Sequence, residues 1–325
     1  MEQQDYDRLV EPHRAELRAH CYRMLGSAQD AEDALQEALL RAWRSLETFE
    51  GRSSLRTWLY TIATNVCLKA IERRPKLVLP IDYGPPADPH DGPGVPLTES
   101  VWIEPYPDAE LGLDDALAGP DARYEQRESI ELAFIAALQH LPARQRAVLI
   151  LRDVLGFSAR EAGDVLEMSP PAINSALQRA HRTVDERLPE HSQQATLRTL
   201  GDERLRALVD GFVAAWERND VGAVVAMLAE DAALTMPPRA TWFRGHEAIA
   251  AFLRGYPLGP AIETRIVETR ANGQPALAHY TRDAGRGPYV FHALDVLTLR
   301  GAEIVEITAF LTTEGYDRYG LPQTL

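Results

Sequence analysis

The chain has 325 residues, a length that favours two or three domains, and 45% of them are hydrophobic, which is enough for packed cores. Its 34 lysines and arginines stand against 48 aspartates and glutamates, so the net charge of −14 excludes nucleic-acid binding by bulk attraction. Any DNA contact must come from local basic surfaces, helped by a partner that supplies more phosphate contacts.

The sequence also argues against metal, cofactor and membrane roles. The two cysteines, Cys21 and Cys67, lack metal-ligand spacing and lie in helical apolar patterns, as expected of small buried residues in a reducing compartment. No phosphate loop, zinc spacing or nucleophile elbow occurs. No signal peptide is recognisable, and no apolar run is long enough to cross a membrane. We expect a cytoplasmic protein without a metal ion or cofactor.

Residues 1–74 are predicted to form an all-helical domain. Helices are expected over Tyr6–Leu25, from Gln29 onward, and over Leu55–Arg74, where Pro75 ends the last one. The second helix has an apolar stripe opposite a face of mixed charge. Trp58 lies in the apolar stripe of the third helix, which favours core packing over a role as a strand-separating wedge.

Residues 75–122 are rich in Pro, Gly and Asp and show little periodicity, so an irregular linker is expected. Within it, the motif WIEPYPD (residues 102–108) is a stiff, partly aromatic peptide suited to docking in a groove. We predict that Trp102, Tyr106 and Asp108 dock on the C-terminal domain of the same chain. The alternative is an aromatic patch in an undocked segment.

Residues 123–190 contain a helix-turn-helix, preceded by a helix expected over Ala122–Leu141. Ser158 and Glu161 are predicted to form a capping box, and a tight turn at Glu167–Ser169 leads to a second helix that begins with two prolines. The exposed face of that helix carries Asn174, Ser175, Gln178, Arg179 and Arg182. This pattern suits a helix in the major groove of DNA; the alternative is a helical hairpin in a core.

Two of these segments resemble one family. DAEDALQEALLRAWRSLETFEG with SLRTWLYTIATNVCLKAIERR (residues 30–51 and 54–74) is similar to region 2 of a sigma-70 factor of the extracytoplasmic-function (ECF) type, and the helix-turn-helix resembles region 4. The order of the two motifs is that of the family. The resemblance implies two all-helical domains that bind RNA polymerase core enzyme and promoter DNA.

The resemblance also implies roles for individual residues in region 2. The β′ clamp helices of the polymerase would bind Asp30, Asp33, Gln36, Glu37 and Arg41. A mixed-charge face suits a polar protein interface, although without the resemblance it would be read as a solvated helix face. The −10 element would be bound by Arg52, Arg56, Thr61, Thr64, Asn65 and Arg73. Asparagine has a donor and an acceptor, so Asn65 suits an extruded base.

In region 4, the resemblance implies binding to the β flap and to the −35 element. Arg179 is our first candidate for a bidentate guanine contact, and the other candidates are Asn174, Ser175, Gln178 and Arg182. The family often has basic residues where this chain has Asn174 and Ala176. That departure predicts weak −35 binding by the isolated protein.

Residues 197–325 are predicted to form an α+β domain with helices first and a curved sheet after them. Helices are expected over Leu205–Asn219, Val221–Leu228 and His246–Arg254, and strands over 232–236, 261–268, 274–280, 289–300 and 303–310. The pattern FVAAWERNDVGAVVAMLAEDAALTMPP, followed by WFRGHEAIAAFL, resembles a SnoaL-like domain. The resemblance implies a cone with an internal pocket, and the candidate lining residues are Trp216, Met236, Trp242, Phe243, His279, Phe291 and Phe310.

These observations predict an ECF-type sigma factor whose SnoaL-like domain regulates it, with a possible small-molecule ligand and without enzymatic activity. One alternative is a bifunctional protein with an isomerase, cyclase or hydrolase in the third domain, dependent on Asp231 or His279. The other is a stand-alone helix-turn-helix regulator, which would bind an operator tightly without polymerase.

Overall fold

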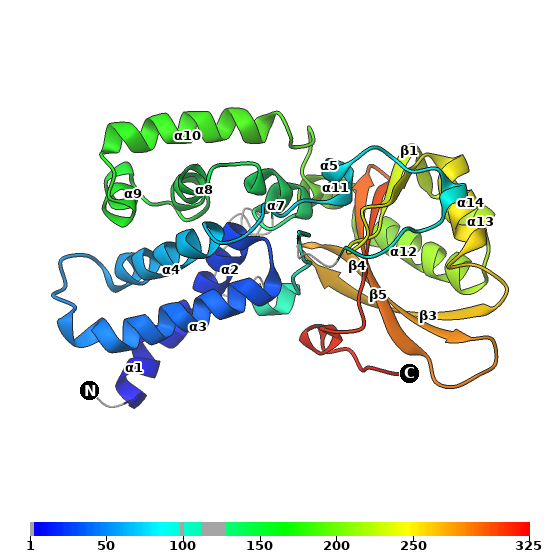
Figure 1. Ribbon diagram of the computed structural model, residues 1–325, viewed down its shortest axis with the longest axis horizontal. Coiled ribbons are helices and arrows are strands. Elements are labelled where there is room, and N and C mark those ends of the chain that lie inside the picture. The colour runs from blue at the N-terminus through cyan, green and yellow to red at the C-terminus, as the bar shows by residue number, and fades with distance from the viewer. Residues whose placement is uncertain (1–2, 98–100, 112–127) are drawn as a thin grey trace. The chain divides into compact units, whose positions relative to one another are not determined.

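The computed structural model describes residues 3–97, 101–111 and 128–325 (Figure 1). The chain forms two compact units. Unit 1 consists of Met1–Leu77 and Ala109–Pro189, and unit 2 consists of Val78–Asp108 and Glu190–Leu325. Regions 2 and 4 therefore share unit 1, whereas most of the linker belongs to unit 2.

The first part of unit 1 is helical, as expected. Its elements are α1 (Gln3–Val10), η1 (Glu11–His13), α2 (Arg14–Leu25), α3 (Ala28–Ser45), η2 (Leu46–Thr48) and α4 (Leu55–Ile71). The single helix expected over Tyr6–Leu25 is broken at η1, where Pro12 lies in the first turn. The side chains of Ser27 and Ser54 cap α3 and α4 by accepting backbone N–H groups, which fixes where both helices begin.

The second part of unit 1 contains the helix-turn-helix. Its elements are α7 (Leu132–Gln139), α8 (Ala143–Leu149), the π-helical turn η5 (Ile150–Val154), α9 (Ala159–Leu166) and α10 (Pro170–Asp185). The capping box of Ser158 and Glu161 is present, and Glu167 adopts a left-handed conformation in the tight turn. Residues 122–127 of the helix expected before α7 lie outside the described residues.

In unit 2, three helices after residue 190 precede a six-stranded sheet in the order β2-β1-β6-β5-β4-β3, and a fourth helix lies between β2 and β3. The helices are α11 (Gln193–Leu200), α12 (Asp202–Glu217), α13 (Val221–Ala226) and α14 (His246–Gly255). The strands are β1 (Leu228–Thr235), β2 (Trp242–Arg244), β3 (Ile262–Ala271), β4 (Gln274–Asp283), β5 (Val290–Arg300) and β6 (Glu303–Leu311), followed by η6 (Tyr316–Tyr319). The expected helices-then-sheet order is thus confirmed; β1 and β6 are parallel, and the other pairs are antiparallel.

A hydrophobic core joins the helices and the sheet of unit 2. Phe212 on α12, Val224 on α13 and Ile249 on α14 pack with Leu277 and Leu297 of the sheet, and all five side chains are buried. Each contributes about 1.5–3 kcal/mol by leaving water. This packing holds the helices on one side of the curved sheet and so shapes the domain.

The polar residues between the predicted domains 123–190 and 197–325 include the start of the helix α11. Gln193 and Gln194 are buried, and their side-chain amides donate to the carbonyl oxygens of Leu299 (2.8 Å) and Gly273 (2.7 Å). The backbone N–H of Leu299 also donates to Oε1 of Gln193 (2.7 Å). These glutamines replace sheet hydrogen bonds, so polarity here marks a tertiary contact and not a linker.

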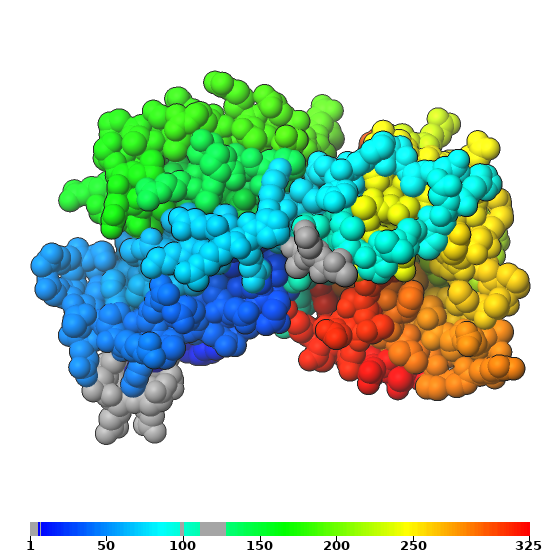
Figure 2. All heavy atoms as spheres, in the orientation of Figure 1, coloured from blue at the N-terminus to red at the C-terminus, as the bar shows by residue number. Residues whose placement is uncertain are grey.

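Three short helical pieces lie in the described part of the linker, α5 (Pro80–Tyr83), η3 (Pro89–Asp91) and η4 (Asp108–Leu111), and the rest of that part is irregular. Figure 2 shows the linker in cyan against the yellow atoms of unit 2. Trp102, Ile103 and Tyr106 are buried. The linker therefore adds apolar residues to unit 2, although its composition alone predicts no core.

Candidate functional site

The exposed face of α10 carries the residues expected at the −35 element. Ile173, Ala176, Ala180 and Val184 are buried on its other side. The five candidate side chains are all exposed: Asn174, Ser175, Gln178, Arg179 and Arg182. α10 packs on α8 and α9, and it runs along the edge of unit 1 in Figure 1. The helix thus presents one continuous polar surface, as major-groove reading requires.

The candidates for the −10 element fall into different environments. Arg52, Asn65 and Arg73 are exposed. Thr61 is half-buried, and its hydroxyl donates to the carbonyl oxygen of Thr57 (2.9 Å). Arg56 is held by a Glu16 carboxylate, with 3.0 Å between Nε and Oε2. In this conformation Asn65 and Arg73 are open to a DNA strand, Arg52 is exposed but paired with Glu50, and Arg56 is occupied.

Thr64, the remaining candidate for the −10 element, does not face solvent. Its side chain is fully buried, and its hydroxyl lies 2.9 Å from Nε2 of His20. The ring of His20 also packs edge-on against Tyr60. Burial, aided by Arg23 and Arg56, lowers the pKa of His20 to about 3. Thr64 therefore holds a neutral buried histidine, and Asn65 beside it is the one that faces solvent.

On α3, the candidate polymerase surface is smaller than expected. Asp33 and Gln36 are exposed, and Arg41 forms an ion pair with Glu37 (2.6 Å) one turn away. Asp30 is the correction: it is buried in the first turn of α3 and paired with Arg74. The available mixed-charge face thus begins at Asp33, because Asp30 is used within the fold.

Regions 2 and 4 contact each other inside unit 1, where α4 packs against α9. The guanidinium of Arg146 on α8 is buried and donates to the carbonyl oxygen of Met24 in region 2 and to Gln139. Burial lowers the pKa of Arg146 to about 10. Phe157 meets the ring of Tyr60 (centroids 5.4 Å apart), and Arg56 lies over both rings. Region 4 therefore occupies Arg56, a candidate DNA contact of region 2.

The linker motif docks on the turn between β3 and β4. Asn272 and Gly273 form a two-residue turn with positive φ at both positions, as in a type I′ hairpin. The backbone N–H of Tyr106 donates to Oδ1 of Asn272 (2.9 Å), and that of Asn272 to the Tyr106 carbonyl oxygen (3.0 Å). Asp108 accepts from the Gly273 N–H (2.7 Å) and from Arg270 (3.2 Å).

Trp102, the third residue named in the motif, is also buried. It pairs with Val78 at the start of the linker through a parallel bridge, and its ring lies 5.4 Å from that of Tyr83. Val78, near the start of the linker, is thus bound to the docked motif at Trp102.

A cavity of about 630 Å³ opens within unit 2, between the sheet and helices α12 and α14. Trp216, Met236 and His279 line it, as expected, together with Phe252 and Leu253 of α14. Its size and mainly apolar wall are typical of a small-molecule site.

Four of the expected lining residues, Trp242, Phe243, Phe291 and Phe310, lie elsewhere. Phe310 faces away because its neighbours Ala309 and Leu311 line the cavity and side chains alternate along a strand. Trp242 donates from its indole N–H to the Gly84 carbonyl oxygen (2.8 Å) of the linker, and Phe243 stacks on Phe252 in the core.

Phe291 is displaced by a β-bulge. The register between β4 and β5 shifts between His279 and Tyr280, which pair with Ala293 and Phe291. One extra residue, His292, is thus inserted in β5, so alternation breaks there and Phe291 packs on Tyr280 instead of facing the cavity. A bulge of this kind has no signal in a single strand's hydropathy pattern.

The polar wall of the cavity contains the predicted His279 together with Asp295 and Thr264, which the sequence pattern missed. Nε2 of His279 lies 3.0 Å from Oδ2 of Asp295 on β5, and both side chains are buried. Trp216 packs edge-on against the His279 ring. Thr264 and His292 also line the wall, and partial burial, with the nearby His279, lowers the pKa of His292. Asp295 could have been found only from the β4–β5 register, because it lies diagonally across from His279.

Asp231, the acid considered for catalysis, lies outside the cavity wall. Its carboxylate is exposed and pairs with Arg300 (2.6 Å). Within the described ranges 3–97, 101–111 and 128–325, no cluster of histidine, cysteine and acidic residues fits a metal ion. None of the helices in these ranges is long and apolar enough to span a membrane.

Comparison with known proteins assigns each part of the chain. The family models for sigma-70 region 2, sigma-70 region 4 and the SnoaL-like domain match residues 9–76, 131–184 and 209–307. The crystal structure of the Mycobacterium tuberculosis extracytoplasmic function sigma factor SigJ is similar in fold, with a TM-score of 0.59 at 20% identity over 99% of this chain and 100% of that one.

Relatives in sequence agree with these matches. The ECF RNA polymerase sigma factor SigE of Mycolicibacterium smegmatis is 29% identical over 58% of this chain and 63% of its own length. The ECF RNA polymerase sigma factor SigG of Mycobacterium tuberculosis H37Rv is 42% identical over 99% of this chain and 85% of its own length. This chain therefore belongs to the ECF RNA polymerase sigma factors, with a SnoaL-like domain after region 4.

Proposed function

We propose that this protein brings RNA polymerase core enzyme to promoters through two DNA-reading surfaces. The first is the exposed face of α10, with Arg179 at its centre, for the −35 element. The second is Asn65, with the exposed Arg52 and Arg73, for the single-stranded −10 element. The observation that carries the proposal is the intact helix-turn-helix, on whose second helix all five candidate side chains are exposed.

The polymerase contact is assigned to the α3 face that begins at Asp33 and continues through Gln36, Glu37 and Arg41. These residues are exposed or half-buried, one turn apart, and opposite the buried stripe of the helix. A net charge of −14 disfavours DNA binding by the free protein, so the polymerase must supply further phosphate contacts. This makes promoter binding depend on core enzyme, which acts in the cytoplasm.

Promoter engagement also requires unit 1 to open. Two elements centred near −10 and −35 lie about 25 base pairs apart, which is roughly 85 Å at 3.4 Å per base pair. Here α4 of region 2 packs directly on α9 of region 4. The contacts of Phe157 with Tyr60 and Arg56 must therefore break before both elements are bound.

The SnoaL-like domain is assigned a regulatory role and no enzymatic one. The linker that joins regions 2 and 4 is folded into unit 2, so the stability of that domain sets how freely the linker extends. Asp231, the acid considered for catalysis, pairs with Arg300 on the surface and lies outside the cavity wall. It is therefore not placed to act together with the buried His279–Asp295 pair.

Promoter opening by the holoenzyme tests the −10 assignment. Asn65→Ala is expected to lower permanganate reactivity of −10 thymines about tenfold while core binding stays unchanged, because only a base-edge contact is lost. The matched control is Gln323→Ala, an exposed residue of unit 2 outside both the DNA surface and the polymerase surface. Equal opening by Asn65→Ala and the control would remove Asn65 from the −10 site.

A further inference from the structure

The cavity of unit 2 has one polar end on a mainly apolar wall. Apolar lining comes from Trp216, Leu234, Met236 and the α14 residues Phe252 and Leu253. The polar end is formed by His279, Asp295 and Thr264 on three adjacent strands. All three side chains are at least nine-tenths buried, yet they face a cavity rather than a packed core.

Two of these polar groups lack hydrogen-bond partners among the described residues. The Thr264 hydroxyl has none, and Nε2 of His279 lies near Asp295 without the alignment of a hydrogen bond. An unmade hydrogen bond on a buried polar group costs about 1–3 kcal/mol. Groups left in this state around a cavity are suited to a ligand that completes their hydrogen bonds.

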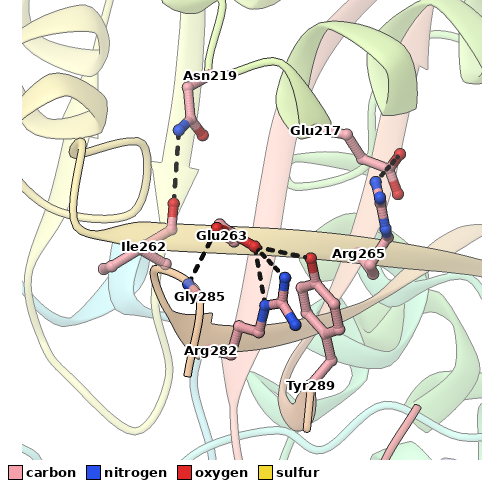
Figure 3. A network of polar contacts seen from close by, with 8 residues as sticks. All are labelled: Glu217, Asn219, Ile262, Glu263, Arg265, Arg282, Gly285 and Tyr289. Atoms are coloured by element: carbon pink, nitrogen blue, oxygen red, sulfur yellow. Dashed lines mark hydrogen bonds and ion pairs between the residues drawn. The ribbon is translucent and has the colours of Figure 1, made fainter. Parts of the chain in front are cut away.

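The charges around the cavity favour a neutral ligand. At the deep end, the Asp295 carboxylate disfavours an anionic head group. At the rim, Arg282 is already held by Glu263, to which it donates from Nε (2.8 Å) and Nη2 (2.5 Å); the Tyr289 hydroxyl donates to the same carboxylate (3.1 Å; Figure 3). Arg239 donates to the Gly94 carbonyl oxygen. These two arginines are engaged, and the third rim cation, Arg286, is exposed.

The linker forms part of the cavity wall. Pro93 lines the cavity, and its two neighbours are glycines with positive φ. A β-carbon on Gly92 would lie 2.6 Å from the hydroxyl of Tyr256, which also lines the cavity, and one on Gly94 would lie 2.4 Å from Oγ1 of Thr241. Only glycine allows this close approach. The linker is thus seated directly on cavity residues through Tyr256 and Arg239.

The geometry points to a ligand site for a neutral, largely apolar small molecule with one hydroxyl or carbonyl group, bound at Thr264 and His279 and covered at Pro93 by the linker. Occupancy adds contacts to the seated linker and stabilises it against unit 2. This extends the proposed regulatory role: the ligand would act on the segment between the two promoter-reading regions without touching either.

The first test is calorimetric titration of the full chain with biphenyl-based probes. We expect 4-phenylphenol to bind at least fivefold more tightly than biphenyl, and biphenyl-4-carboxylate to bind more weakly than 4-phenylphenol. Thr264→Val should abolish the preference for the phenol. Thr235→Val is the matched control, because its hydroxyl is equally buried and unpartnered but does not line the cavity.

The second test measures hydrogen exchange over residues 90–97 with and without 4-phenylphenol. Slower exchange in the wild-type chain and in Thr235→Val, but not in Thr264→Val, is the expected result. The inference is overturned if the carboxylate binds tightest, if both variants lose the preference equally, or if exchange in the linker is unchanged at saturation. Neither test contains polymerase or DNA, so its failure is independent of promoter recognition.

Discussion

Arg179 and His20 represent two kinds of residue in unit 1, one exposed for recognition and one buried for stability. Arg179 has a planar guanidinium on the open face of α10, which suits bidentate binding to guanine. His20 is enclosed between Thr64 and Tyr60 and stays neutral. Each makes a separate prediction.

Arg179→Ala is expected to weaken holoenzyme binding to a promoter by about 1–3 kcal/mol, that is roughly 5- to 150-fold, and to relax selection at one −35 position. The comparison is Arg187→Ala, an exposed arginine beyond the end of α10, which removes the same charge. Competition binding with single-base promoter variants measures both. An equal loss on all −35 sequences would reduce Arg179 to a phosphate contact.

Unit 1 is expected to become less stable as the pH is lowered, because His20 binds a proton more readily in the unfolded chain. Folding lowers the pKa of His20 from 6.5 to about 3, so its contribution is complete above pH 6.5 and is lost as the pH falls toward 3. Between pH 6.5 and 5 the loss is roughly 2 kcal/mol. Hydrogen-exchange protection of the backbone amides in α2 and α4 measures the stability of unit 1 separately from that of unit 2.

His20→Gln can still hydrogen-bond to Thr64 and does not titrate, so its unit 1 should lose less protection over the same pH range. His191→Gln, an exposed substitution in unit 2, is the control and should leave the protection of unit 1 as in the wild type. Equal pH dependence in all three chains would show that His20 is not the group responsible.

At the scale of elements, the linker is attached to the C-terminal domain through the WIEPYPD motif, on the domain for which docking was predicted. Asp108 accepts hydrogen bonds from the Gly273 backbone and from Arg270, and so fixes the end of the linker on the β3–β4 turn. The turn itself is set by the Asn272–Gly273 pair, for which a type I′ conformation is favoured.

Asp108→Ala leaves the buried N–H of Gly273 without its acceptor and is expected to cost about 1–3 kcal/mol of linker docking. Limited proteolysis within residues 78–108 should then be faster. Asp91→Ala, in the same linker but exposed, is the matched control. Resistance equal to wild type would indicate that the aromatic residues Trp102 and Tyr106 dock the linker without Asp108.

Periodicity and capping residues predicted most helices and strands, because those signals are local. Ser158 with Glu161 marks the start of α9, and alternation in 303–310 marks β6. Features that depend on residues far along the chain could not be predicted from local sequence. The helix α11 is held by the hydrogen bonds of Gln193 and Gln194 to the sheet region. The position of Phe291 is set by a β-bulge. Asp30 and Thr64 are buried because they contact partners far along the chain.

At the scale of the whole molecule, two separately folded units divide the work. Unit 1 contains both promoter-reading regions, and unit 2 holds the segment that connects them. We therefore expect this sigma factor to need core enzyme in order to find DNA, and we expect its linker to be where its transcription activity is regulated.

A truncation after Pro189 should leave the linker without its docking surface and expose Trp102, Ile103 and Tyr106. We expect this form to bind core enzyme but to give a changed amount of promoter-directed transcript. The control is the full chain at the same concentration. Identical transcript yields from the two forms would exclude regulation by the SnoaL-like domain.

The most direct test is start-site mapping of transcripts made in vitro from fragmented genomic DNA of the host by core RNA polymerase, with and without the full-length protein. The account predicts discrete start sites that appear only with the protein, each preceded by two shared motifs about 10 and 35 base pairs upstream. Failure to bind core enzyme, or the absence of any protein-dependent start site, would contradict it.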